Sequence, residues 1–316
     1  MVGARGVIGW LRMAGVVHIL TGPTAVGKTA WALRWAQERG AEIVSCDSLL
    51  FYRGMDIGTA KPTVAERALV PHHLIDVCPV QERVSVVDYV AWAREAVTAI
   101  ASRGRAVLVV GGSGFYLKCF FGPVRDEVNV PVSLRDEVDR RLRNEGLEGL
   151  VRELRRLNPA GLGALDVANS RRVVRALERC LASGRTLAEL ADDFAKTPGP
   201  FAAWQTRVTC LTCDPEVLQR RLELRVHAML ADGLVEEVAR LRDQGLESNP
   251  SAAGAIGYRE TLAVLRGEAE RAGLAEAIIR STRALVKKQR TWFRTQLPPH
   301  RAIRTEEASV AALFEA

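Results

Sequence analysis

The stretch Leu20-Thr21-Gly22-Pro23-Thr24-Ala25-Val26-Gly27-Lys28-Thr29 decides the fold of this 316-residue chain. It contains the pattern G-x-x-x-x-G-K-[ST], which is typical of a phosphate-binding loop (P-loop) between a strand and a helix. The apolar run from Val16 to Leu20 predicts the strand, and the residues from Lys28 to about Glu38 predict the helix. Glycines let successive N–H groups point inward, and the helix N-terminus adds partial positive charge.

The P-loop predicts a pyrophosphate site without specifying the compound bound. Lys28 is expected to reach phosphate oxygens, and the Thr29 hydroxyl is expected to ligate Mg²⁺, the one cofactor that we predict. A plain glycine-rich turn with a lysine at a helix start is the alternative, and the fit to strand, loop and helix together favours the P-loop. The predicted phosphate-binding residues are Gly22, Pro23, Thr24, Ala25, Val26, Gly27, Lys28 and Thr29.

Composition indicates a folded protein of the cytoplasm. Hydrophobic residues make up 48% of the chain, and no run of them is long enough to span a membrane. The segment Met1–Arg12 is a poor signal peptide, and Met13 is an alternative start. The six cysteines are scattered, as in a reducing compartment. Cys210 and Cys213 form a lone C-x-x-C, which we interpret as apolar strand residues because zinc needs four ligands.

The charge predicts a polyanionic partner. The net charge is +7 and the pI is about 9.3. The surplus concentrates in 271–304, where nine Lys and Arg residues face one acidic residue, Glu276. A solvated basic face is the alternative, but such a face normally mixes charge signs, so nucleic acid is favoured.

The order of predicted elements indicates an α/β fold. Strands are predicted at Ala41–Cys46, His72–Asp76, Ala106–Val110 and Arg207–Cys213, alternating with helices. This alternation predicts a P-loop NTPase-like, doubly wound parallel sheet. Ser85 is expected to cap one helix, and the rest of the chain after the last strand is predicted to be helical, at 215–231, 234–244, 256–266 and 271–296.

The middle of the chain predicts a helical insertion. From about residue 123 the composition changes, and Ser133–Gly184 is rich in arginine and predicted to be helical throughout. We therefore expect a first part of the core at 14–122, an inserted helical subdomain at 123–203, and completion of the core with basic C-terminal helices at 204–316.

Two side chains at predicted strand ends are catalytic candidates. Asp47 follows the strand after the P-loop helix, where it can help to bind Mg²⁺ or accept a proton, although a cap or turn role is equally open. Ser113 lies in a Gly-Gly-Ser-Gly turn after Val110, and turn chemistry alone could explain it. In many P-loop hydrolases an apolar strand ends in an aspartate that helps to hold Mg²⁺. Here the predicted strand Ala106–Val110 is followed by glycine instead, so we expect a transfer reaction other than ordinary hydrolysis.

Arginines at helical spacing form two further groups. Arg171, Arg172, Arg175 and Arg179 recur at steps that place several of them on one helix face, which suits a sugar-phosphate backbone better than a solvated surface. Arg221 and Arg225 lie four residues apart on another predicted helix. They can close on phosphates as the arginines of a lid do, or remain on the surface.

Taken together, several motifs resemble the tRNA dimethylallyltransferases (tRNA isopentenyltransferases), from about Val16 to Arg294. The motifs are Gly22–Thr29, Ser45–Ser48, Tyr52-Arg53-Gly54-Met55-Asp56-Ile57-Gly58-Thr59-Ala60-Lys61-Pro62, His72–Asp76, Gly111–Tyr116, Arg171–Glu178, Ile256–Glu260, Thr282-Arg283, Lys288-Gln289 and Thr291-Trp292.

The resemblance implies transfer of a dimethylallyl group from its diphosphate to N6 of the adenosine just 3′ of the anticodon in tRNA. It implies that Asp47 is the general base, assisted by Ser113, and that Arg221 and Arg225 help to hold the diphosphate. The tRNA contacts that it implies are Asp47, Ser48, Leu49, Leu50, Ser113, Arg135, Arg171, Arg172, Val173, Val174, Arg175, Arg283, Lys287 and Lys288. The partners are therefore tRNA and dimethylallyl diphosphate, with no membrane, and a monomer is expected.

Some positions depart from the family pattern. Ser113 stands where the family usually has Thr, Val26 replaces the commoner Ser, and Asn169-Ser170 replaces a frequent Asn-Asp-Pro.

Three alternative functions remain open from the residues: a dimethylallyltransferase acting on free adenylate, a P-loop small-molecule kinase, and a non-catalytic RNA-binding protein. The sequence does not specify which tRNAs are modified.

Overall fold

The structure is a computed structural model that describes residues 14–124 and 128–315. Met13 lies outside these residues. The chain divides into two compact units, one formed by residues up to Phe121 together with those from Pro200 onward, and one formed by Gly122–Gly199. No helix within the described ranges combines the length and the apolarity that crossing a membrane requires.

The larger unit is built on a six-stranded parallel sheet. The strand order is β3-β2-β4-β1-β5-β6, and every neighbouring pair is parallel. The central strands are buried, because apolar residues such as Val17, Ile19 and Leu108 lie between layers of helices. The strands are β1 (Ala14–Thr21), β2 (Ala41–Ser45), β3 (His72–His73), β4 (Ala106–Val110), β5 (Trp204–Thr212) and β6 (Arg301–Arg304).

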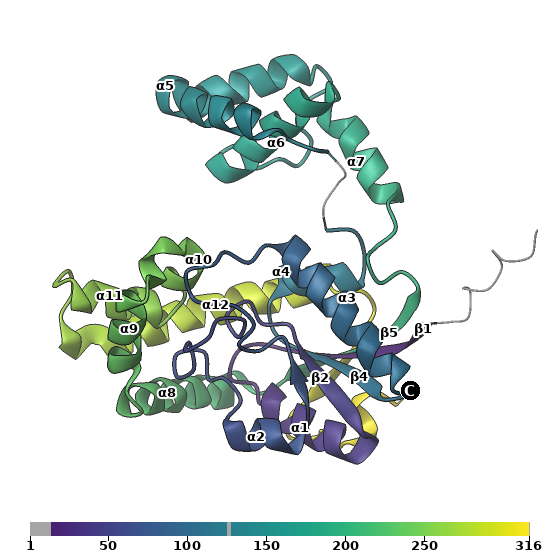
Figure 1. Cartoon of the computed structure of the whole chain (residues 1–316), viewed down its shortest axis with the longest axis vertical. Helices are drawn as coiled ribbons and strands as arrows, with labels where there is room; N and C mark the ends of the chain where they lie inside the picture. Colours follow the sequence, from purple (N-terminus) through teal and green to yellow (C-terminus); the bar gives the residue numbers. More distant parts are fainter. Residues whose placement is uncertain (1–13, 125–127, 316) are drawn as a thin grey trace, which may run out of the picture. The chain divides into compact units, whose positions relative to one another are not determined.

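Helices connect and surround these strands, as the α/β prediction requires. Figure 1 shows α9, α10 and α11 grouped together, and α12 as a long helix. The helices and 3₁₀ turns of this unit are α1 (Lys28–Arg39), α2 (Val64–Leu69), α3 (Val86–Ser102), α4 (Gly114–Leu117), η1 (Lys118–Phe120), α8 (Pro215–Ala231), α9 (Leu234–Asp243), η2 (Leu246–Ser248), α10 (Pro250–Ala253), α11 (Tyr258–Leu265), η3 (Arg271–Gly273), α12 (Leu274–Gln296) and η4 (Ala311–Leu313).

In the part of the smaller unit that the structure describes, all regular structure is helical. Helices α5 (Val132–Leu157), α6 (Ser170–Ser183) and α7 (Leu187–Lys196) form it (Figure 1). Its core includes Leu150, Leu154, Val173 and Leu177. Asn169 caps α6, since its Oδ1 accepts the N–H of Arg172 at 3.2 Å.

Several predicted boundaries differ from the structure. The strand predicted at 72–76 stops at His73, because Leu74 and Asp76 adopt left-handed backbone angles (φ 63° and 58°) that end an extended strand. The insertion is not helical throughout, since residues 158–169 connect α5 to α6 without a helix. Strand β6 was not predicted and lies beyond the last predicted helix, 271–296, and Cys213 follows β5 instead of lying within it.

Candidate active site

The P-loop lies between β1 and α1, as its motif predicts. Gly22 has φ 144°, and a methyl group there would meet the carbonyl oxygen of Leu211 at 2.5 Å, so only glycine fits. Gly27 also has a positive φ, of 102°, immediately before α1. The Val26 N–H donates to the Pro23 carbonyl at 3.3 Å and closes the turn. The loop therefore curls at the N-terminus of α1, where the helix dipole favours an anion.

A cavity of about 430 Å³ joins the P-loop to the ends of β2 and β4. Asp47, at the end of β2, lies in the same cavity wall as Lys28 and Thr29. Part of the remaining wall is apolar and is formed by Ala30, Ala32, Ile43, Leu50, Ala60, Pro62, Ile75 and Val110. Polar side chains, including Ser45, Glu66 and His72, also line the cavity. One cavity thus combines a phosphate cradle, a carboxylate and an apolar wall.

Two arginines of α8 complete the cation set around this cavity. Arg221 donates from Nη1 to the Val26 carbonyl at 3.2 Å, and Arg225 donates from Nη2 to the Thr59 carbonyl at 3.0 Å. Both side chains line the cavity. The structure therefore places the two arginines at the P-loop and not at a distant surface.

Lys28 is held by the P-loop itself. Its Nζ donates to the carbonyls of Gly22 (2.8 Å) and Pro23 (2.9 Å). Burial lowers the pKa of Lys28 to about 8, while the negative charge of Asp47 opposes this shift and the positive charge of Arg225 adds to it. A bound anion would supply the countercharge that favours the protonated lysine.

The Asp47 carboxylate is oriented by its own turn. Its Oδ1 accepts the N–H of Leu49 at 3.1 Å, a local turn of the kind that aspartate favours. The neighbouring Ser48 N–H donates to the Ser113 Oγ at 3.2 Å, which ties the turn after β4 to the turn after β2. Asp47, Ser48 and Ser113 are therefore brought together as predicted.

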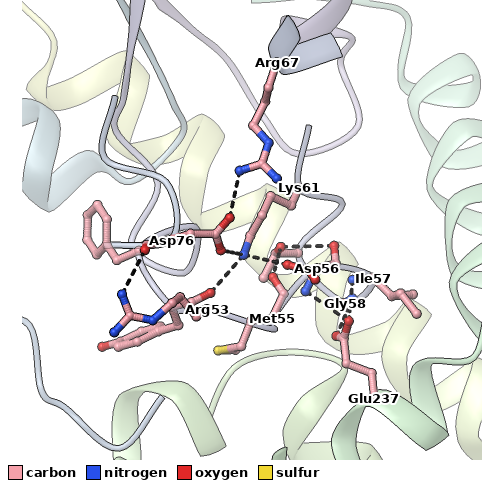
Figure 2. A network of polar contacts seen from close by, with 12 residues as sticks. Arg53, Met55, Asp56, Ile57, Gly58, Lys61, Arg67, Asp76 and Glu237 are labelled. Carbon is pink, nitrogen blue, oxygen red and sulfur yellow. Dashed lines mark hydrogen bonds and ion pairs between the residues drawn. The ribbon is translucent and has the colours of Figure 1, made fainter. Parts of the chain in front are cut away.

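A second loop, residues 52–62, supplies part of the cavity wall. Lys61 is buried, with its Nζ 2.5 Å from Asp76 Oδ1, 2.6 Å from Asp56 Oδ1 and 2.9 Å from the Tyr52 carbonyl (Figure 2). Arg67 donates to the other oxygen of Asp76 at 2.7 Å. These contacts fix the two ends of the loop against each other.

Glu237 of α9 holds the centre of the same loop. Its carboxylate accepts the backbone N–H groups of Asp56 (3.0 Å), Ile57 (2.8 Å) and Gly58 (3.2 Å), as Figure 2 shows. It also accepts the hydroxyl of Tyr258 at 2.6 Å, and both side chains are buried. Sequence reasoning missed Glu237, because its helix alone suggests an exposed charge.

Most of the side chains predicted to contact tRNA are available at a surface. Arg135, Arg171, Arg172 and Arg175 are exposed, although Arg175 also pairs with Glu178 at 2.8 Å. Val174 is half-buried. Val173 is a correction, because its side chain is fully buried in the core of the insertion and offers no surface to RNA.

The basic residues of α12 lie along a separate groove. A depression of about 590 Å³ between α8 and α12 is lined by Arg283, Lys287, Arg290 and Arg294. Arg283 is also engaged within the chain, through Gln219 and Glu223 at 2.7 Å each. Lys288 is exposed. These residues are spatially distinct from the cavity that holds Asp47.

The parallel sheet, the P-loop and the carboxylate at a strand end define a P-loop α/β enzyme with a helical insertion. The family model described as IPP transferase matches residues 50–296, and the chain belongs to this family.

Relatives and solved structures agree with this assignment. A tRNA dimethylallyltransferase from Opitutus terrae is 64% identical over 287 residues, covering 91% of this chain and 92% of that protein. One from Limosilactobacillus fermentum is 42% identical over 292 residues, with 91% and 92% covered. The crystal structure of the tRNA isopentenylpyrophosphate transferase from Bacillus halodurans is 32% identical, has a TM-score of 0.67, and is matched over 92% of this chain and 90% of that chain.

Proposed function

We propose that this enzyme is a tRNA dimethylallyltransferase. It transfers a dimethylallyl group from dimethylallyl diphosphate to N6 of the adenosine immediately 3′ of the anticodon and releases diphosphate. The observation that carries the proposal is the single cavity in which a P-loop lysine, the Asp47 carboxylate and an apolar wall meet. The names of the relatives support the same activity.

The leaving group is bound by the cationic side of the cavity. Lys28, Arg221, Arg225 and the P-loop amides bind the diphosphate oxygens and stabilise the negative charge that develops as the bond from oxygen to the allylic carbon breaks. The apolar wall accepts the five-carbon group. Because the loop amides recognise any pyrophosphate, the wall beyond the loop must reject other phosphate compounds.

The adenine amine is activated from the opposite side. Because Asp47 Oδ1 accepts the Leu49 N–H, Oδ2 is assigned to accept the proton that N6 loses as the N–C bond forms. Ser113, joined to Ser48, supports the turn that carries Asp47. The adenosine must leave the stacked anticodon loop to reach this cavity, as other base-modifying enzymes require.

Mg²⁺ fits the donor set of this cavity. Within the described residues no group of three His, Cys, Asp or Glu side chains converges on a metal. Mg²⁺ nevertheless binds commonly through one or two protein oxygens together with substrate phosphates. Thr29 would hold it through its hydroxyl, with Asp47 nearby, and the ion would neutralise diphosphate charge. We propose a monomer as the working unit, acting on tRNA in the cytoplasm.

Transfer is tested by mass spectrometry of tRNA after incubation with the enzyme, Mg²⁺ and dimethylallyl diphosphate. One added prenyl group on the anticodon-loop adenosine is expected. Asp47→Asn should keep both substrates bound but lose on the order of 10² to 10⁴ in rate, because the amide preserves shape without accepting a proton. Prenylation of free adenylate alone, or ATP turnover without prenyl transfer, would instead support one of the alternatives.

The proposed RNA contact of the insertion is tested by salt dependence. Replacing Arg172 and Arg175 with alanine should weaken tRNA binding and reduce the log–log salt slope by roughly one to two units, because two phosphate contacts are lost. The affinity for dimethylallyl diphosphate should stay unchanged. An unaltered salt slope would identify these arginines as a solvated face.

A further inference from the structure

Gln289 of α12 joins the P-loop to the turn after β4. Its Oε1 accepts the backbone N–H of Thr24 at 2.9 Å, and its Nε2 donates to the Gly112 carbonyl at 3.2 Å. Both bonds span more than 170 residues of sequence, 265 and 177 respectively. One side chain therefore satisfies a donor in one loop of the site and an acceptor in another.

The packing around Gly112 shows how closely these parts approach. A methyl group at Gly112 would meet Gln289 Nε2 at 2.9 Å, the Gly22 carbonyl at 3.3 Å and Lys28 Nζ at 3.6 Å. Glycine at 112 thus allows α12, the P-loop and the side chain of Lys28 to converge. A methyl group at the nearby Gly114 would clash with the ring of Trp292, one helical turn beyond Gln289.

The bond from Gln289 divides the P-loop amides into two sets. The Thr24 N–H is directed to α12, and the Val26 N–H closes the turn onto Pro23. The donors available to a ligand therefore come from the other cavity-lining residues, including Gly27 and Lys28. An amide side chain suits this position, because it accepts and donates at once without adding charge beside Lys28.

We propose that Gln289 is a positioning residue, which fixes the P-loop in its diphosphate-binding shape through Thr24 and Gly112. This inference rests on the proposed function, since it concerns the affinity for dimethylallyl diphosphate. Gln289 acts through the backbone of the loop, and it keeps the loop and the turn that carries Ser113 in register.

The first test is calorimetry of dimethylallyl diphosphate with Mg²⁺ on the wild-type enzyme, Gln289→Leu and the matched control Gln296→Leu. Gln296 ends the same helix and bonds only weakly to Thr295, at 3.4 Å. Gln289→Leu should bind about tenfold more weakly, since it loses two hydrogen bonds. Gln296→Leu should bind dimethylallyl diphosphate like the wild type.

Gln289→Glu gives a readout that a merely structural role would not move, because it restores one of the two contacts. It keeps the acceptor for the Thr24 N–H but has no N–H to donate to the Gly112 carbonyl. Its affinity for dimethylallyl diphosphate should therefore lie between that of the wild type and that of Gln289→Leu. This variant also decides the question if Gln289→Leu fails to fold.

The outcomes separate the two proposals. Absence of diphosphate binding by the wild-type enzyme would overturn the proposed function. Tight wild-type binding with an equally tight Gln289→Leu variant would overturn the positioning role alone, as would wild-type affinity in Gln289→Glu. An equal loss of diphosphate affinity in Gln296→Leu would assign the effect to α12 as a whole and would also overturn the positioning role of Gln289.

Discussion

Two loops line the same cavity, and each contains a lysine in a different electrostatic setting. Lys61, in the 52–62 loop, lies between the carboxylates of Asp56 and Asp76. Lys28, in the P-loop, donates to two backbone carbonyls, and burial lowers its pKa to about 8. The first lysine has its countercharge inside the protein, whereas the second is arranged to receive it from a ligand.

This difference separates a structural cation from a functional one. A buried charge without a partner is costly, so a protein retains one only where something else compensates for it. In the sequence, both residues are lysines in loops that contain glycine. The positions of the carboxylates around them differ, and those positions are set by the fold.

The largest effect is expected for Lys61→Met. Removing this buried cation leaves Asp76 with Arg67 alone and takes away the partner of the exposed Asp56, so the free energy of unfolding should fall by about 3 kcal/mol. Urea denaturation measures this loss, with Lys118→Met, at an exposed position, as the control. If both variants unfold at the same urea concentration, the proposed structural role of Lys61 is removed.

Lys28→Met should show the opposite pattern. The affinity for dimethylallyl diphosphate should fall by about 2 kcal/mol or more, because a charge-assisted contact in a closed site is lost. The free energy of unfolding should not decrease, since the variant no longer buries a poorly compensated charge. Calorimetry and urea denaturation on the same preparation test both parts. A Lys28→Met variant that is less stable than the wild type but binds dimethylallyl diphosphate equally well would contradict the functional role of Lys28.

The smallest effect is the pH dependence of diphosphate binding. Lys28 in the free enzyme loses its proton above about pH 8, and a bound diphosphate favours the charged form and raises its pKa. Binding should therefore take up a proton, and the affinity should fall by up to about tenfold per pH unit above 8. Calorimetry at pH 8.5 in two buffers of different ionisation enthalpy detects the uptake. Equal heats in both buffers would contradict this account of Lys28.

Local patterns were sufficient for much of the fold. The P-loop, the buried strands and the helix beginning at Pro215 were predicted because each signal lies within a short window of sequence. Strand β6 was missed because it is short and lies at the edge of the sheet, with only two apolar residues, Ala302 and Ile303, between Arg301 and Arg304. Its only strong signal is pairing with β5, which sequence does not display.

The site residues that belong to short sequence motifs could be predicted. The residues that reach the site only through the folding of distant segments could not. Asp47 and Lys28 come from motifs near the P-loop, and the structure brings them into one cavity. Glu237 and Gln289 act on backbone groups about 180 or more residues away, so neither residue carries a local signal of its partner. Val173 was predicted to contact tRNA from its place in a motif, but its side chain is buried in the core of the insertion.

The contact between Glu237 and the 52–62 loop gives this enzyme a second anion cradle that is permanently filled. Three consecutive N–H groups converge on a carboxylate there, in the manner that a P-loop addresses a phosphate. The anion is tethered to the chain, so its effective concentration is high and dissolved phosphate cannot displace it. The cavity wall formed by Thr59, Ala60 and Pro62 is thus ordered before substrate arrives, and binding adds no ordering cost on that side.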